Sequence, residues 1–239
     1  MQFVDIELPV AALIGQEALH LAKTTAALSG HWFDAKSRVG EGLPIWPPRV
    51  GTAPASPVKS NAGPERISNG LHLTAGRNCG YWVKSITNTA QNFAFALRFG
   101  TMADDLGTGL TLNPRSARGY HVLSHRADMA VFMSGRAQLA LPLPRRSRDL
   151  FMVAGFSGAR SFLRAGGQMV ISEPDPDPTL GGPADLFIGC RGHADRQSHT
   201  LGDGVIASAL FWPVNILDPE QPAGASGLAA LEAYDFWGG

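Results

Sequence analysis

The sequence has few cysteines and no long apolar run. Only Cys79 and Cys190 occur in 239 residues, too few for a disulfide framework, so both are expected to stay free thiols in a reducing compartment. No apolar stretch approaches the roughly 20 residues that a transmembrane helix needs. The start, MQFVDIELPVAAL, lacks the basic residues that open a secretion signal. We therefore expect folding in the cytoplasm and no membrane insertion.

Charge is also scarce, and it is balanced. Charged residues make up 17% of the chain, with 20 Lys and Arg against 20 Asp and Glu, whereas an average soluble domain has roughly 25%. A net charge of zero supplies no long-range field that would attract a polyanion. Nucleic acid is therefore not an expected partner.

Glycine and proline are abundant, at 28 and 17 residues, which indicates many turns and counts against a helical bundle. A helical pattern occurs at 9–28, and it is either an amphipathic helix packed on the domain or an arm that docks on a partner. Five prolines between 44 and 57 exclude a helix or central strand there. That stretch is either a linker or a strap across a sheet, with Trp46 and Val50 to bury.

From about residue 70 onward, apolar residues alternate with small or polar ones. Phe93, Phe95, Leu97 and Phe99 share one face of an expected strand. Further strands are expected at 120–124, 129–133, 137–141, 150–156, 160–164, 168–172, 185–190 and 204–212. Short strands separated by turns, without intervening helices, predict an all-β antiparallel sandwich or jelly roll.

The order of these segments resembles the laminin-G-like, concanavalin A-like sandwich. The matching stretches are NFAFALRFG, YHVLSHRADMAVFMSG, LFMVAGFSGARSFLRAGGQMV, ADLFIGC and GDGVIASALFWPVNIL, and HWFDAKSR resembles the opening strand that normally pairs beside the closing one. The resemblance implies a concanavalin A-like β-sandwich at 30–218. We expect a helical arm for assembly at 1–29 and a tail with a short helix at 219–239.

Catalysis is tested by the positions of the carboxylates. Laminarinase-like glycoside hydrolases share this fold, and retaining enzymes place two carboxyl groups about 5 Å apart, so acidic residues must alternate along a strand. None of the seven glutamates lies in an expected sandwich strand, and Asp5–Ile6–Glu7 precedes the domain. The sequence therefore predicts that the chain is not an enzyme.

Metal ligands are sparse as well. His121 and His125 would lie about 13 Å apart along an extended strand, and His193 and His199 have no third ligand nearby in the sequence. We expect no zinc. The loop that contains Glu173, Asp175 and Asp177 could offer oxygen ligands to Ca²⁺, but it lacks EF-hand spacing. A solvated acidic loop is the alternative.

Arginine is the most distinctive polar feature. Arg115 and Arg118 lie in NPRSARGY, and Arg145, Arg146 and Arg148 lie in PLPRRSRD. Both segments are turns, where this architecture places recognition, and guanidinium groups suit the carboxylates or sulfates of an acidic glycan. Solvated arginines are the alternative. Three short strands between the two turns would place them at opposite ends, which argues against one shared patch.

The resemblance, with the expected cytoplasmic folding, implies a structural protein of a phage-like particle, assembled in the cytoplasm. Such a protein would serve in a spike, tail fibre or capsid decoration, and its sandwich would attach to cell-surface polysaccharide on the host. Its partners would be other structural subunits, including further copies of itself. The alternatives are a purely structural decoration protein that binds no glycan and a degenerate laminarinase-like glycoside hydrolase.

Overall fold

The computed structural model describes residues 15–37, 45–59, 64–67, 70–101, 105–115, 119–144, 147–177, 180–194 and 199–237. The elements in chain order are α1 (Gln16–Ala27), β1 (His31–Asp34), the 3₁₀ helix η2 (Ala35–Ser37), β2 (Ser56–Pro57), β3 (Glu65–Ile67), β4 (Gly70–Leu73), β5 (Tyr81–Thr87), β6 (Asn92–Thr101), β7 (Gly107–Pro114), β8 (His121–Arg126), β9 (Met129–Ser134), β10 (Ala137–Pro142), β11 (Leu150–Ser157), β12 (Arg160–Ala165), β13 (Gln168–Ile171), β14 (Ala184–Ile188), β15 (Gly204–Trp212) and α2 (Pro222–Trp237).

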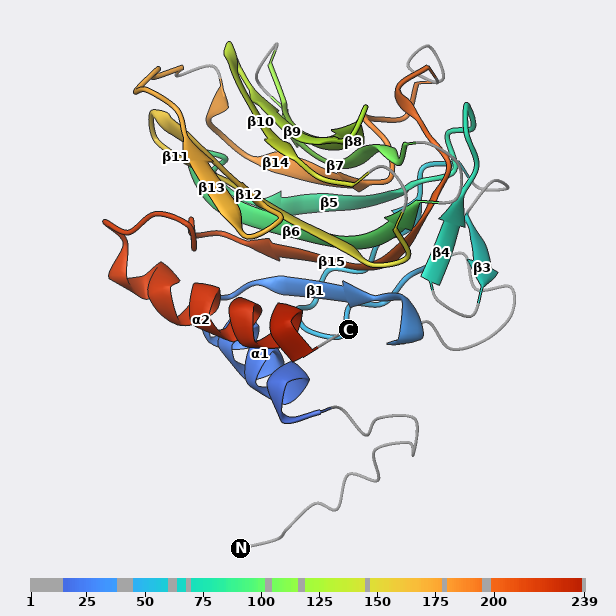
Figure 1. Ribbon diagram of the computed structural model, residues 1–239, viewed down its shortest axis with the longest axis horizontal. Helices are drawn as coiled ribbons and strands as arrows, with labels where there is room; N and C mark the ends of the chain where they lie inside the picture. The colour runs from blue at the N-terminus through green and yellow to red at the C-terminus, as the bar shows by residue number, and fades with distance from the viewer. Residues whose placement is uncertain are drawn as a thin grey trace, which may run out of the picture.

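The strands form two antiparallel sheets stacked face to face (Figure 1). The first sheet has the order β13-β12-β11-β6-β15-β4-β3, with β1 also paired to β15, and the second has the order β10-β9-β8-β7-β14-β5-β2. The prediction of an all-β antiparallel sandwich with a helix near each end is confirmed. The opening strand β1 pairs beside the closing strand β15, from His31 with Phe211 to Asp34 with Ser208, as the resemblance implied.

The core between the sheets is built by the alternation along β6. Phe93, Phe95, Leu97 and Phe99 point inward and are essentially inaccessible to solvent. Phe95 meets Phe132 of the second sheet edge-on, with the ring centroids 5.8 Å apart. Burying such side chains contributes about 1.5–3 kcal/mol each, so this row is a main source of cohesion between the sheets.

The outward residues of β6 explain where the helices lie. Ala94 and Ala96 are small, and they leave room for α1 and α2 on the outer face of the first sheet (Figure 1). Leu21 of α1 is fully buried there, and Trp212 donates a hydrogen bond from Nε1 to Thr25 Oγ1 at 3.2 Å. The helix expected at 9–28 therefore packs on the sandwich from Gln16 onward. Residues 1–14 lie outside the described part of the chain, and an assembly role for the arm stays a prediction.

The proline-rich stretch is a strap wherever it is described. Trp46 is fully buried, and its Nε1 donates to the carbonyl of Asp34 at 3.0 Å. Val50 forms a bridge with Trp32 of β1. The two side chains that the sequence offered for burial thus tie the start of this stretch to the first sheet, while β2 near its end pairs with β5 of the second sheet.

The imidazole of His121 is buried in the core between the sheets. His121 lies against Phe93, Phe132 and Phe156, with Nδ1 2.8 Å from Ser134 Oγ. Its burial lowers the pKa of His121 to about 3.

Cys79 and Cys190 are both buried free thiols, as predicted. Burial raises the pKa of the Cys190 thiol. In the described residues, no helix is both long enough and apolar enough to cross a bilayer.

Candidate functional site

Two chain segments cross closely at one end of the second sheet. Gly107 forms a bridge with Leu201, and the amide of Asp203 donates to the carbonyl of Asp105 at 3.0 Å. Each of the two crossing segments needs a glycine at the point of contact. Gly107 has a φ of +72°, and a Cβ on Gly202 would lie 2.1 Å from the carbonyl oxygen of Asp105. The crossing brings the residues before β15 against the start of β7.

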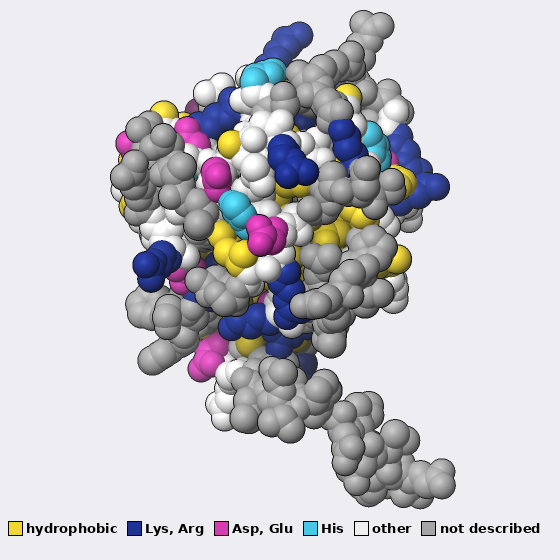
Figure 2. All heavy atoms as spheres, turned by 90° about the vertical axis from the view of Figure 1, so that its right-hand side faces the viewer, with side chains coloured by type: hydrophobic (Ala, Val, Ile, Leu, Met, Phe, Trp, Pro, Cys, Tyr) yellow, Lys and Arg dark blue, Asp and Glu magenta, His cyan; other side chains and the backbone are white. Residues whose placement is uncertain are grey.

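A pocket of about 360 Å³ opens beside this crossing, a size within the range of small-ligand sites. Its lining residues are Ala75, Asp105, Gly107, Arg126, His199, Thr200, Leu201, Gly202 and Asp203. They come from four separate parts of the chain. This end of the sandwich lies on the right of Figure 1, near β4, and faces the viewer in Figure 2. There, Lys and Arg side chains alternate with acidic and histidine side chains and form no field of one sign.

The acidic groups of the pocket are held by fixed partners. Asp203 places Oδ1 2.9 Å from Nε2 of His72. Asp105 accepts a hydrogen bond from the amide of Ala127 at 2.9 Å. Glu65 lies opposite His72 in the register of β3 and β4, with its Oε2 3.9 Å from Nδ1 of His72. The expectation that no glutamate lies in a strand therefore fails for Glu65.

Two arginines, Arg126 and Arg191, lie near the pocket. Arg126, the last residue of β8, lines the pocket. Burial, and after it the positive charge of Arg191, lowers the pKa of Arg126, while Asp105 acts in the opposite direction. Arg191 donates to Thr108 Oγ1 at 3.2 Å and to the Tyr120 hydroxyl at 3.4 Å. The Nη2 nitrogen of Arg126 is shielded from water and meets no acceptor within the described residues.

Of the five arginines that the sequence singled out, the structure describes two. Arg118, Arg145 and Arg146 lie outside the described residues. Arg115 donates to Asp185 and Ser85 at the end of β7 remote from the pocket. Burial would raise the pKa of Asp185, but the hydrogen bonds from Arg115 and from the Ser85 amide outweigh it and lower that pKa. Arg115 is therefore already engaged within the domain.

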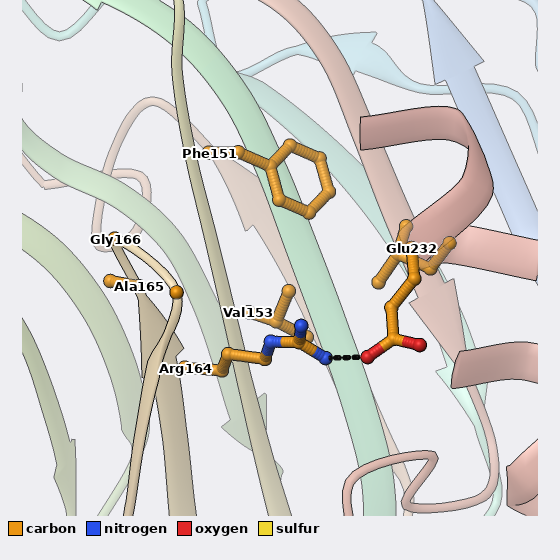
Figure 3. A pocket seen from close by; sticks show the side chains of 8 residues that line it. Phe151, Val153, Arg164, Ala165, Gly166 and Glu232 are labelled. Carbon is orange, nitrogen blue, oxygen red and sulfur yellow. Dashed lines mark hydrogen bonds and ion pairs between the residues drawn. The ribbon is translucent and has the colours of Figure 1, made fainter. Parts of the chain in front are cut away.

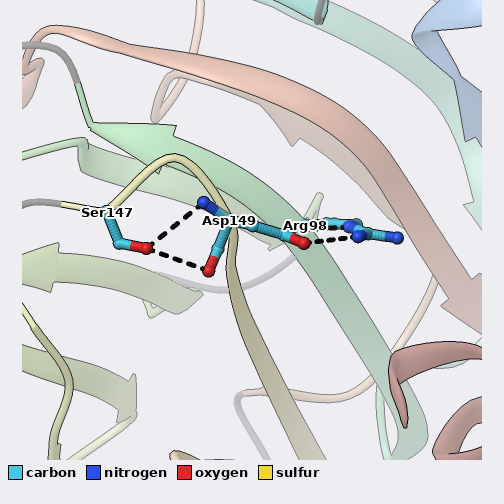
Figure 4. Close-up of polar contacts among 3 residues, drawn as sticks. All are labelled: Arg98, Ser147 and Asp149. Atoms are coloured by element: carbon cyan, nitrogen blue, oxygen red, sulfur yellow. Dashed lines mark hydrogen bonds and ion pairs between the residues drawn. The ribbon is translucent and has the colours of Figure 1, made fainter. Parts of the chain in front are cut away.

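Arg148 is exposed and lies at the pocket end, beside Gly100 of β6. Its neighbour Asp149 is bound by Arg98, whose Nε donates to Oδ1 at 2.7 Å while Nη2 contacts Oδ2 (Figure 4). β8, β9 and β10 are three full strands between the two arginine turns. Arg115 and Arg148 thus lie at opposite ends, as the chain reversals predicted. Their role in glycan binding stays a prediction.

The candidate metal ligands are dispersed. His125 is buried, and His193 is exposed and lies edge-on against Trp82 and Phe187. The loop with Asp175 is tied to the turn after β11 by a hydrogen bond that the Asp175 backbone N–H donates to the Ala159 carbonyl at 2.7 Å. Within the described ranges, no three His, Cys, Asp or Glu side chains lie together as metal ligands would. The expectations about zinc and Ca²⁺ stay predictions.

A second, smaller pocket lies on the helix side of the first sheet. It has a volume of about 40 Å³ and apolar walls that include Phe151, Val153 and Leu231. An ion pair between Arg164 of β12 and Glu232 of α2 crosses it (Figure 3). This space holds little more than a water molecule or two, and the ion pair fastens α2 to the sheet. The larger pocket is the better candidate for a ligand.

Comparisons with known proteins identify the fold. No model of a known protein family matches the chain, and no curated protein matches it. The sialidase of Trypanosoma rangeli in complex with sialic acid superposes with a TM-score of 0.64 at 15% identity, covering 93% of this chain and 37% of the sialidase chain. The chain thus spans little more than a third of the sialidase. The fold is that of a concanavalin A-like β-sandwich.

Two other solved structures of this kind are more remote. The mouse laminin α1 chain, domains LG4-5, has a TM-score of 0.45 at 13% identity and covers 64% of this chain and 43% of its own. Domain 4 of an extracellular arabinanase from Geobacillus stearothermophilus, solved with arabinotriose, has a TM-score of 0.45 at 11% identity, covering 83% and 87%.

The prediction that the chain is not an enzyme is wrong. It rested on the missing pair of alternating carboxylates, yet the solved structures that cover 91–93% of the chain belong to a sialidase, which is an enzyme. The fold is shared by enzymes and by proteins without catalytic activity, so the fold alone does not separate the two classes.

Sequence reasoning singled out His199 of the pocket, as a candidate zinc ligand, but it missed the other polar side chains of the lining. Arg126 ends a strand, and Asp203 lies between the glycines Gly202 and Gly204 just before the last strand. Polar side chains at strand ends, next to glycines that permit close approach, are the sequence feature that could have pointed to these residues. That feature does not indicate which strand ends lie together in the fold.

Proposed function

We propose that this sandwich is a carbohydrate-binding domain and that it takes a sugar in the pocket at the end of the second sheet. The observation that carries the proposal is the lining of that pocket, which combines guanidinium, carboxylate and imidazole side chains in about 360 Å³. Sugars are recognised by hydrogen bonds from such groups, placed in a pocket that is already formed. The sandwich fold, shared with a sialidase, supports the proposal.

The preorganisation of the polar groups also supports it. Asp203 is held by His72 and Asp105 by the Ala127 amide, so neither carboxylate must be ordered when a ligand arrives. Ordering a side chain costs about 0.5–1.5 kcal/mol of affinity. Fixed carboxylates avoid that cost.

The test is a glycan array probed with the full chain, alongside Arg126→Met and His199→Ala variants. We expect the unaltered chain to bind a small set of glycans and both variants to lose most of that signal. Arg136→Met, an exposed arginine in the turn after β9 at the other end of the sandwich, is the control and keeps the signal. Absence of binding to every glycan, with a folded protein, contradicts the proposal.

Glycoside hydrolysis is the second candidate. Two carboxylates, Asp105 and Asp203, line the same pocket, and hydrolysis of glycosidic bonds generally uses a pair of carboxyl groups. Incubation with sialosides and with laminarin-type glucans, followed by measurement of released sugar, tests it. Turnover that Asp203→Asn abolishes supports hydrolysis, and binding without release in every case supports the binding domain alone.

The setting in a phage-like particle, with attachment to host polysaccharide, is a proposal that rests on the sequence. Particles purified from the source culture should contain the chain by mass spectrometry. Its absence from such particles, when the chain is abundant in the same cells, contradicts this setting.

A further inference from the structure

The charges around the larger pocket are balanced in a way that limits its ligand. Asp105, Asp203 and Arg126 line the pocket, and the positive charge of Arg191 acts on Arg126. The described side chains thus place two negative groups beside two positive ones. A site for an anion would need an excess of positive charge near the ligand. The described side chains that line the pocket do not supply such an excess.

The hydrogen-bonding capacity of Asp203 points to a hydroxyl ligand. Its Oδ1 is occupied by His72, and its Oδ2 has no partner in the described part of the chain. A carboxylate oxygen can only accept hydrogen bonds. A sugar hydroxyl can donate to it, whereas the carboxylate of a uronic or sialic acid would be repelled.

The guanidinium of Arg126 supplies the complementary group. It can only donate, and it lines the same pocket as Asp203. Neighbouring hydroxyls on a sugar ring each donate and accept, so a donor and an acceptor fixed in one pocket suit a pair of them. Bonds in which one partner is charged are about twice as strong as those between neutral groups.

We infer that the pocket selects neutral sugars with free neighbouring hydroxyl groups and rejects acidic sugars, with Asp203 as the acceptor and Arg126 as the donor. This inference rests on the proposed carbohydrate-binding function. The sequence suggested that the arginine turns recognise acidic glycans. This pocket has no part in such recognition.

The experiment uses matched pairs of small sugars and the full chain. The methyl glycosides of galactose, glucose and mannose are each compared with the methyl glycoside of the corresponding uronic acid (the uronide), which carries a carboxylate at C6 in place of the hydroxymethyl group. Binding is measured by chemical-shift titration at 50 and 500 mM NaCl. We expect at least one neutral glycoside to bind about tenfold more tightly than its uronide, with an affinity that changes less than about twofold with salt.

The variant Asp203→Asn keeps the size of the side chain and removes its charge. It should weaken the neutral glycoside by about three- to tenfold, since a charge-assisted bond becomes a neutral one. The same variant should narrow the difference between glycoside and uronide to within about threefold, because the repulsion is gone. Asp175→Asn makes the same change of charge in the loop beside Ala159, at the other end of the sandwich, and should change neither.

The outcomes separate this inference from the proposed function. Tighter binding of a uronide, or equal effects of Asp203→Asn and Asp175→Asn, overturns the inference and leaves carbohydrate binding intact. Glycan-array binding without binding of any neutral glycoside in the pocket does the same. No binding of any glycan or glycoside by the folded chain overturns both.

Discussion

The outer faces of the two sheets are covered in different ways. On the first sheet, Ala94, Ala96 and Val153 lie under the apolar sides of α1 and α2. On the second sheet, Thr108 and Thr111 are equally buried, but their hydroxyls donate to the carbonyls of Thr200 and Cys190, at 3.2 and 3.0 Å. One cover is apolar and helical, and the other is a loop held by hydrogen bonds.

This difference separates stability from recognition. Apolar burial contributes about 25 cal/mol per Å², whereas the net gain from a hydrogen bond is only about 0.5–1.5 kcal/mol. The helix side is therefore expected to carry more of the free energy of unfolding. The loop side is expected to carry less of it, and it is the side on which the larger pocket lies.

Removal of α1 should have the largest effect. A chain that begins at Ser29 loses Leu21 and uncovers Trp32 and Trp212, all fully buried in the complete chain. Exposing several such side chains should cost about 4 kcal/mol or more, which lowers the melting temperature by about 10 °C in a domain of this size. Thermal melting followed by circular dichroism measures it. A chain that lacks only residues 1–14 is the control. An unchanged midpoint for the chain that begins at Ser29 would contradict this prediction and support the hypothesis that the helix serves assembly alone.

A single helix residue sharpens the same point. Leu21→Ala should destabilise the chain by about 2–5 kcal/mol, because the site is fully enclosed and a cavity remains. Leu19→Ala makes the same change on the same helix, where the side chain is 45% exposed, and should cost less than about 1 kcal/mol. Urea unfolding of both variants checks the pair. Equal losses would mean that α1 is not held by its buried face.

Acid should weaken the contact between the two sheets. The pKa of His121 is about 3 in the folded chain, below the ordinary value of about 6.5. As pH falls from about 6.5 toward 3, the unfolded chain binds a proton that the folded chain does not, so stability falls by about 1.4 kcal/mol per pH unit. Above pH 6.5 this contribution does not change.

Urea unfolding between pH 7 and pH 4.5 measures that slope. His121→Leu should flatten it, whereas Ser134→Ala, which removes only the hydroxyl beside Nδ1 of His121, should keep it. The carboxyls of Asp185 and Asp218, whose hydrogen bonds outweigh burial and lower their pKa values, add losses only at lower pH. An unchanged slope in His121→Leu would refute the assignment to this histidine.

The sequence predicted most of the fold because strand alternation is local. The row from Phe93 to Phe99 predicts β6, and a strap that packs Trp46 and Val50 was one of the two predicted alternatives; Trp46 is fully buried and Val50 half-buried. β7 was missed because its segment, GTGLTLNP, carries two glycines and ends in proline, which are residues typical of turns. Its pairing with β8 and β14 overrides that local preference.

The candidate site could not be predicted in the same way. Asp105, Arg126 and Asp203 come together only through the order of the strands and the glycine crossing at Gly107. Asp149 shows the same limit, because its partner is Arg98, 51 residues away, and not the adjacent Arg148. Local sequence identifies side chains that are able to bind, but it does not say which of them are already paired.

The pocket side should respond in binding and hardly in stability. Arg126→Met keeps the length of the side chain and removes the donor, so glycan affinity should fall about tenfold, equivalent to about 1.4 kcal/mol. The melting temperature should stay the same or rise slightly, since the variant removes a buried nitrogen without an acceptor and the repulsion from Arg191. Isothermal titration and thermal melting test the two parts. A large loss of stability would make Arg126 a structural residue.

Arg148→Ala should have the smallest effect of all. The side chain is exposed, and the carboxylate next to it is already bound by Arg98. Removing a solvated cation usually changes stability by less than about 0.5 kcal/mol, and binding of neutral glycans should change less than twofold, because Arg148 does not line the pocket. Adsorption to acidic and neutral polysaccharides, measured at low and moderate salt, is the check. A loss confined to acidic polysaccharide, and shrinking as salt rises, would show that this turn binds anionic glycans independently of the pocket.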